Sequence, residues 1–165
     1  TIETFGYGYA PAAGRDTVHG LFAARSVPLG LQLKSGLVMQ RDDGRVVDRF
    51  RHRLMIPIRR DTGVMVGFGG RALDEGQVPK YLNSPETPIY SKGRTLYGLD
   101  VTKGAIKKHN YCVLVEGYFD LAQVGHAPDD ARFAREQGRR HDGQHRVLRS
   151  ADVDVAAQRH AAFNQ

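Results

Sequence analysis

The chain has 165 residues, of which 41% are hydrophobic, so it can bury a core and is long enough for one domain, or one domain and part of another. Its formal net charge is +6, and residues 44–108 carry thirteen Lys and Arg against six Asp and Glu, which weakly favours a polyanionic partner. The single cysteine, Cys112, excludes a disulfide or a cysteine-based zinc site within these residues. No apolar run approaches the ~20 residues of a membrane span, and there is no signal-peptide pattern, so we expect no membrane partner and a cytoplasmic location.

The first 36 residues predict two short helices. Asp16 is a candidate N-cap for a helix that runs to about Arg25. Pro28 predicts the start of a second helix, which ends before Gly36.

Residues 37–73 predict β-structure. Apolar stretches flank Asp- and Gly-containing turns, which is typical of two hairpins: residues 37–40 and 46–47 around 42–45, and residues 53–59 and 64–68 around 61–63. Pro57 has no amide hydrogen, so it is expected at an edge or at a gap in the ladder. Gly67–Arg71 is expected either to break its strand or to bring the backbone close to another group.

The next segment, 74–91, is rich in Gly and Pro and predicts a loop. Beyond this loop, the sequence predicts a helix over about 96–107, a strand at 111–115 that buries Cys112, and a helix from Tyr118. From Gly125 to Gln165 only six residues are large and apolar, so this segment is expected to be a poorly packed tail.

Five blocks of sequence in a fixed order carry the strongest signal: Asp48–Ile58, Val66–Arg71, Pro79–Thr87, Lys92–Leu99 and Val115–Asp120. Together they resemble the RNA-polymerizing core of bacterial replicative DNA primases over about residues 5–121, and Lys80–Thr87 (KYLNSPET) is the most specific block. The resemblance implies an α/β fold with a primase-core N-terminal subdomain over 1–110 and the start of a toprim domain over 111–124, followed by the divergent tail over 125–165.

A primase holds single-stranded DNA and an RNA–DNA hybrid, which requires cations along a shallow groove and few base-specific contacts. Arg51 and Arg53 alternate in sequence, so they are expected to project from one face of a strand. Tyr81 and Tyr90 are candidates for stacking on bases. The full set of expected nucleic-acid-binding residues is Arg51, Arg53, Arg71, Lys80, Asn83, Lys92 and Arg94. The competing interpretation is an ordinary charged surface.

An apolar strand over 113–115 delivers Glu116 at its carboxyl end, and Asp120 follows in the first helical turn, so both carboxylates are expected to face one space. By resemblance to toprim enzymes, Glu116 and Asp120 are the catalytic candidates, and acidic residues further along hold Mg²⁺ or Mn²⁺. Asp152 and Asp154 are the candidates for completing that metal site with Glu116, although Arg149 and Ser150 are expected to break the strand before them and the family's glycine is lacking. A shifted reading frame after Leu121 would also produce such a tail.

The resemblance implies template-directed synthesis of short RNA primers from ribonucleoside triphosphates. Zinc and a replicative helicase are expected to be bound by regions outside these residues, so the chain is interpreted as part of a catalytic core. Two alternatives remain open: a non-catalytic single-stranded-DNA-binding fragment, and another toprim enzyme such as a topoisomerase or nuclease. The Lys80–Thr87 block argues against the second.

Overall fold

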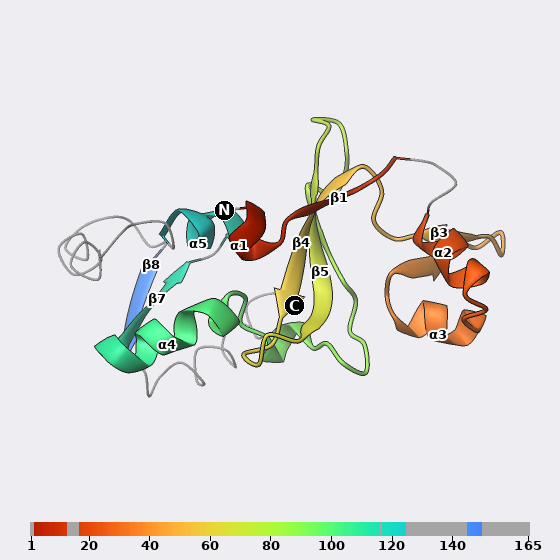
Figure 1. Ribbon diagram of the computed structural model, residues 1–165. Helices are drawn as coiled ribbons and strands as arrows, with labels where there is room; N and C mark the ends of the chain where they lie inside the picture. The colour runs from red at the N-terminus through yellow and green to blue at the C-terminus, as the bar shows by residue number, and fades with distance from the viewer. Residues whose placement is uncertain (1, 13–16, 116, 125–144, 150–165) are drawn as a thin grey trace. The chain divides into compact units, whose positions relative to one another are not determined.

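The computed structural model describes residues 2–12, 17–115, 117–124 and 145–149 (Figure 1). The chain divides into two compact units. The first, which we call the sheet unit, contains Ile2–Ile58 and Met65–Lys92. The second, the strand-pair unit, contains Arg59–Val64 and the chain from Gly93 onward. The mixture of helices and antiparallel strands confirms the predicted α/β class.

The sheet unit is built on four strands in the order β1-β4-β5-β6. Their bounds are β1 Gly8–Ala10, β4 Arg53–Arg59, β5 Met65–Ala72 and β6 Tyr81–Asn83, and a helix α1, Ile2–Phe5, precedes them. The buried apolar side chains include Ile56 and Ile58 of β4, Val66 of β5 and, just before β4, Phe50. The hairpin predicted around residues 61–63 is confirmed. The short strand β6 was missed within the predicted loop.

The sequence made separate predictions for Pro57 of β4 and for the glycines of β5. Pairing between β1 and β4 ends at Met55, so Pro57 lies at a gap in that ladder, as predicted. The expectation that Gly67–Arg71 breaks its strand is wrong, because β5 continues to Ala72. The alternative, a close approach, is confirmed: a Cβ on Gly70 would lie 2.8 Å from the Phe50 ring.

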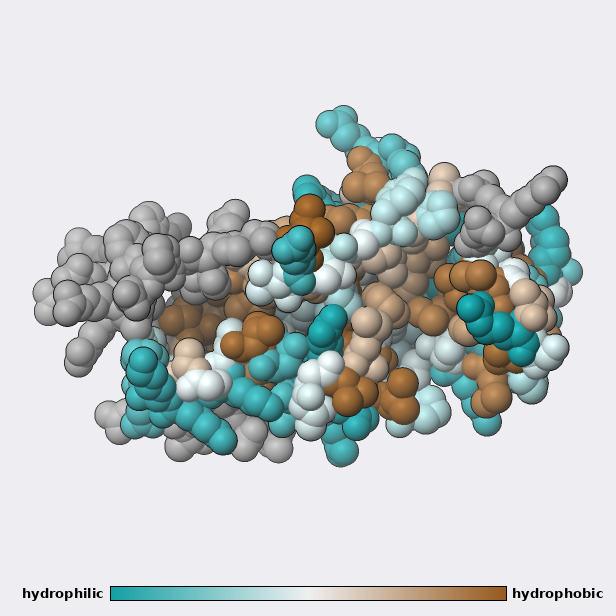
Figure 2. Space-filling model, in the orientation of Figure 1, coloured by the Kyte–Doolittle hydropathy of each residue, from teal (hydrophilic) through white to brown (hydrophobic). Residues whose placement is uncertain are grey.

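A second part of the sheet unit pairs β2, Val38–Gln40, with β3, Val46–Asp48, beside helices α2, Val18–Ala24, and α3, Leu29–Lys34 (Figure 1). The N-cap of α2 is Thr17, whose hydroxyl accepts from the Gly20 amide at 3.2 Å; the predicted cap, Asp16, lies outside the described residues. Asp48 of β3 adds a long-range cap, because its carboxylate accepts from the Val18 and His19 amides, each at 2.9 Å. Apolar side chains gather on the surface over α2 and α3 (Figure 2).

The strand-pair unit contains helix α4, Leu99–His109, strand β7, Tyr111–Val115, helix α5, Tyr118–Val124, and strand β8, His145–Arg149. A 3-10 turn, η1, Lys92–Arg94, spans the boundary of the two units. Gly98, at a φ of +79°, caps the start of α4, and Leu121 packs where a Gly98 side chain would be. The Lys103 amino group donates to the Asp61 carbonyl within the same unit.

β8 pairs with β7 in antiparallel register, with Tyr111 opposite Arg149 and Val115 opposite His145. The expectation that Arg149 interrupts the strand before Asp152 is therefore wrong, because Arg149 is itself a paired residue of β8. Cys112 of β7 is buried, which confirms its predicted place in the core. No helix in the described part of the chain is long and apolar enough to cross a membrane.

Candidate nucleic-acid interface

Arg51 and Arg53 do not share a strand face. β4 begins at Arg53, and His52 before it has a φ of +49°, in the left-handed region, which breaks the extended backbone that alternation requires. Arg51 is exposed, whereas Arg53 is only 4% exposed. The expectation that both side chains project from one strand face is therefore corrected by the backbone turn at His52.

The buried Arg53 guanidinium is held by backbone carbonyls. Its Nη1 donates to the Pro79 carbonyl at 2.8 Å and to the Gly70 carbonyl at 3.3 Å. Burial lowers the pKa of Arg53 from its ordinary value, yet arginine remains charged in proteins. The carbonyl dipoles therefore offset the loss of water around a buried cation.

Three residues that the sequence predicted to contact nucleic acid, Arg71, Tyr81 and Asn83, lie on the β5–β6 pair. Arg71 lies opposite Tyr81, and Asn83 lies opposite Gly69. Directly opposite residues of an antiparallel pair point to the same side, as do residues two apart on a strand. Arg71, Tyr81 and Asn83 therefore share a face of the β5–β6 pair.

Lys80 immediately precedes β6, and its carbonyl accepts from the Ala72 amide at 2.8 Å while its side chain is exposed. Lys92 is also exposed, and its amide donates to the Glu86 carboxylate at 2.7 Å. Both lysines belong to the sheet unit. Arg94 is exposed and belongs to the strand-pair unit.

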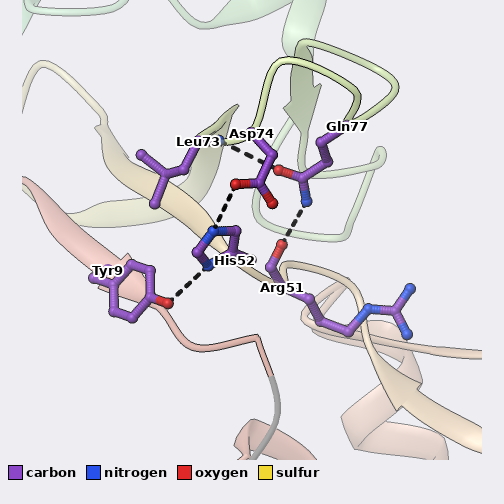
Figure 3. A network of polar contacts seen from close by, with 6 residues as sticks. All are labelled: Tyr9, Arg51, His52, Leu73, Asp74 and Gln77. Atoms are coloured by element: carbon purple, nitrogen blue, oxygen red, sulfur yellow. Dashed lines mark hydrogen bonds and ion pairs between the residues drawn. The ribbon is translucent and has the colours of Figure 1, made fainter.

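A polar network that sequence reasoning missed joins distant segments of the sheet unit (Figure 3). The Tyr9 hydroxyl lies 2.9 Å from Nδ1 of His52, and Nε2 of His52 lies 3.2 Å from the Asp74 carboxylate. Gln77 donates from its side-chain amide to the Arg51 carbonyl at 2.8 Å and accepts from the Leu73 amide at 3.3 Å. Three of these four contacts join positions more than twenty apart, so no short-range spacing in the sequence signals the network.

Tyr81 and Tyr90 differ in access to solvent. Tyr81 is 45% exposed and stays a candidate for stacking on a base. Tyr90 is 4% exposed, and burial, with a smaller contribution from the Glu86 charge, raises the pKa of its phenol. The stacking role expected of Tyr90 is wrong, because its ring lies against the position of a Gly67 Cβ in the interior.

Among the predicted catalytic and metal-binding carboxylates, only Asp120 lies in the described part of the chain; Glu116, Asp152 and Asp154 lie outside it. Asp120 is exposed, and its carboxylate accepts from the Gly117 amide at 3.1 Å. The described residues contain no cluster of three or more His, Cys, Asp or Glu that could hold a metal.

The chain is similar to a family of known proteins. Residues 1–103 match the family "DNA primase catalytic core, N-terminal domain". A DNA primase of Synechococcus elongatus is 49% identical over 122 residues, which are 73% of this chain and 17% of that protein. A DNA primase of Geobacillus stearothermophilus is 41% identical over 153 residues, 93% of this chain and 25% of that protein. The chain thus spans a quarter or less of the length of these relatives.

Solved structures give the same result. The E. coli primase catalytic core is 42% identical with a TM-score of 0.64, covering 75% of this chain and 40% of that one. A primase catalytic domain bound to single-stranded DNA is 39% identical with a TM-score of 0.62, covering 75% of this chain and 39% of that one.

Proposed function

The chain belongs to the family of the DNA primase catalytic core, N-terminal domain, and on this basis we propose that its sheet unit binds the template strand during synthesis of RNA primers. The observation that carries this proposal is the face of β5–β6 that combines Arg71, Tyr81 and Asn83. A cation and an exposed aromatic ring suit a nucleic-acid strand that is bound through its phosphates and through stacking of its bases.

Arg51, Lys80 and Lys92 extend the proposed cationic surface of the sheet unit, since all three are exposed. Arg94, which is exposed on the strand-pair unit, is proposed separately as a nucleic-acid-binding residue. A solved primase domain similar to this chain is bound to single-stranded DNA, which supports the same class of ligand here. The proposed partners are single-stranded DNA, the RNA–DNA hybrid and ribonucleoside triphosphates. A replicative helicase is proposed to bind regions other than these.

For the chemistry, we propose Glu116 as the carboxylate that assists proton transfer and Asp120 as its neighbour. The divalent ion, Mg²⁺ or Mn²⁺, would neutralise charge on the triphosphate. Asp152 and Asp154 remain candidate ligands. The antiparallel register gives them no support, because β8 ends beside Tyr111, whereas residue 116 follows the opposite end of β7. Parallel strands, by contrast, bring their carboxyl ends together.

Binding is tested by fluorescence anisotropy of a labelled single-stranded oligonucleotide over a series of salt concentrations. Lys80→Ala and Lys92→Ala should each weaken binding about fivefold at 0.1 M salt and reduce the slope of log affinity against log salt by about 0.7, because each loses one phosphate contact. Lys34→Ala in α3 removes the same charge from another exposed position of the sheet unit and is the matched control. Unchanged slopes for Lys80→Ala and Lys92→Ala would identify both lysines as ordinary surface charges.

The alternative function, single-stranded DNA binding without catalysis by this polypeptide, rests on the small number of candidate carboxylates in the sequence: Glu116, Asp120, Asp152 and Asp154. We expect the 165-residue chain to bind DNA and to make little or no primer, since two hard cations require several converging oxygen ligands. The test is primer synthesis in Mg²⁺ or Mn²⁺. Synthesis that is lost in both Glu116→Gln and Asp152→Asn would reject the alternative and establish these carboxylates as a working site.

A further inference from the structure

We propose that Arg53 is a positioning residue for Lys80 and does not itself contact nucleic acid. This inference rests on the proposed nucleic-acid-binding function of the sheet unit and assigns different roles to two arginines that the sequence treats alike. The contacts of Arg53 with the 73–80 loop carry it.

Lys80 is fixed on both sides of its own Cα atom. On one side, the carbonyl of Pro79 accepts from Nη1 of Arg53 at 2.8 Å. On the other side, the carbonyl of Lys80 accepts from the Ala72 amide at 2.8 Å. The backbone that carries the Lys80 side chain is therefore held between the buried guanidinium and the end of β5.

The side chains of Arg53 and Arg71 lie on opposite faces of β5, so they cannot bind a common ligand. The Arg53 Cδ atom lies 3.0 Å from the position of a Gly70 Cβ, so the side chain packs on the face toward which Gly70 points. Arg71 is the next residue of the strand and points to the opposite face. Arg53 is also only 4% exposed, so little of its side chain is accessible to a phosphate.

The two residues before Arg53 hold the same loop. Gln77 donates to the Arg51 carbonyl at 2.8 Å, and His52 lies 3.2 Å from Asp74, as Figure 3 shows. The guanidinium of Arg51 extends away from Gln77 in that view and is exposed. Arg51 thus combines a loop anchor in its backbone with a cation left for the ligand, whereas Arg53 uses its guanidinium as an anchor.

A double-mutant cycle on binding affinity tests this assignment in the full 165-residue chain. The single variants are Arg53→Met, Lys80→Ala and Arg51→Met, and each arginine change is combined with Lys80→Ala. The readouts are affinity for a labelled single-stranded oligonucleotide and its salt slope, with far-UV circular dichroism to verify folding.

We expect Arg53→Met and Lys80→Ala each to weaken binding about fivefold at 0.1 M salt, the effect of one lost phosphate contact. Combining them should have no further effect on affinity or slope, because Arg53 acts through Lys80. Arg51→Met combined with Lys80→Ala should lose about 25-fold in total, because two independent phosphate contacts multiply. Additive losses for the Arg53 and Lys80 pair would overturn the proposal.

Gln77→Met supplies a second test if Arg53→Met does not fold. This substitution removes the hydrogen bond from the loop residue Gln77 to the Arg51 carbonyl and keeps the length of the side chain. In the Lys80→Ala background it should also have no effect on binding affinity. A multiplied loss in that pair would contradict loop positioning. If Lys80→Ala and Arg51→Met both leave binding unchanged, the proposed interface itself fails; if Lys80→Ala weakens binding but the Arg53 cycle is additive, only the positioning role fails.

Discussion

The sheet unit and the strand-pair unit place their candidate functional side chains by different means. In the sheet unit, long-range bonds fix the backbone: Arg53 reaches the Pro79 carbonyl, and Nε of Arg49 donates to the Asn83 carbonyl at 3.2 Å. In the strand-pair unit, the carboxylate of Asp120 bonds to Gly117, three residues away. The difference indicates that the proposed nucleic-acid surface depends on packing of the whole sheet, whereas the position of Asp120 depends on one turn.

The largest expected effect tests whether the sheet depends on its central strands. Ile56 of β4 is 0% exposed, so Ile56→Ala should lower the free energy of unfolding by about 4 kcal/mol, from lost burial and the cavity left behind. Urea unfolding followed by circular dichroism measures the loss. DNA affinity at equal folded concentration should fall as well, because the loop anchors depend on this sheet.

Two controls bracket that result. Val78→Ala in the sheet unit changes a side chain that is 87% exposed and should alter the free energy of unfolding by less than about 0.5 kcal/mol. Cys112→Ala in β7 of the strand-pair unit should cost about 1 kcal/mol, a typical value for a small change at a buried position. A loss for Ile56→Ala no larger than that for Cys112→Ala would remove the contrast between the units.

The next effect concerns the turn on which α5 packs. Gly98→Ala should cost about 3 kcal/mol in unfolding free energy, because φ is +79° and the new Cβ would lie 2.1 Å from Leu121 Cδ2. Gly63→Ala is the matched control, with a φ of +85° and open space around it, and should cost about 1 kcal/mol. Equal losses in thermal unfolding would mean that Leu121 does not pack on Gly98.

The smallest effect is a pH dependence. Tyrosinate is the charged form, and burial raises the pKa of Tyr90, so the unfolded chain releases this proton at a lower pH than the folded chain. The contribution of Tyr90 to stability is therefore complete below about pH 10 and is lost as the pH rises further. The free energy of unfolding should fall by at most about 1.4 kcal/mol per pH unit from this group. Tyr90→Phe should reduce this alkaline loss in urea unfolding. Tyr81→Phe, which changes a tyrosine that is 45% exposed, is the control, and an equal reduction there would contradict a role of burial.

Much of the local structure follows from short-range sequence signals. The Asp- and Gly-containing turns predicted both hairpins because glycine adopts positive φ, as Gly44 and Gly63 do here. The start of α4 lies three residues beyond the prediction, since Gly98 ends the preceding turn in the left-handed region. The family resemblance could also be recognised from the sequence, because the five blocks occur in a fixed order and Lys80–Thr87 is specific to the family.

The sequence by itself determined the α/β class, the hairpins and the primase family. Only the tertiary structure decided which charged and aromatic residues remain accessible: the left-handed His52 separates Arg51 from Arg53, and Tyr90 is buried. Sequence patterns report the period of a strand or helix over a few residues, whereas burial depends on partners far along the chain. The bonds of Arg53 join residues 17 and 26 positions apart, and no local pattern encodes that separation.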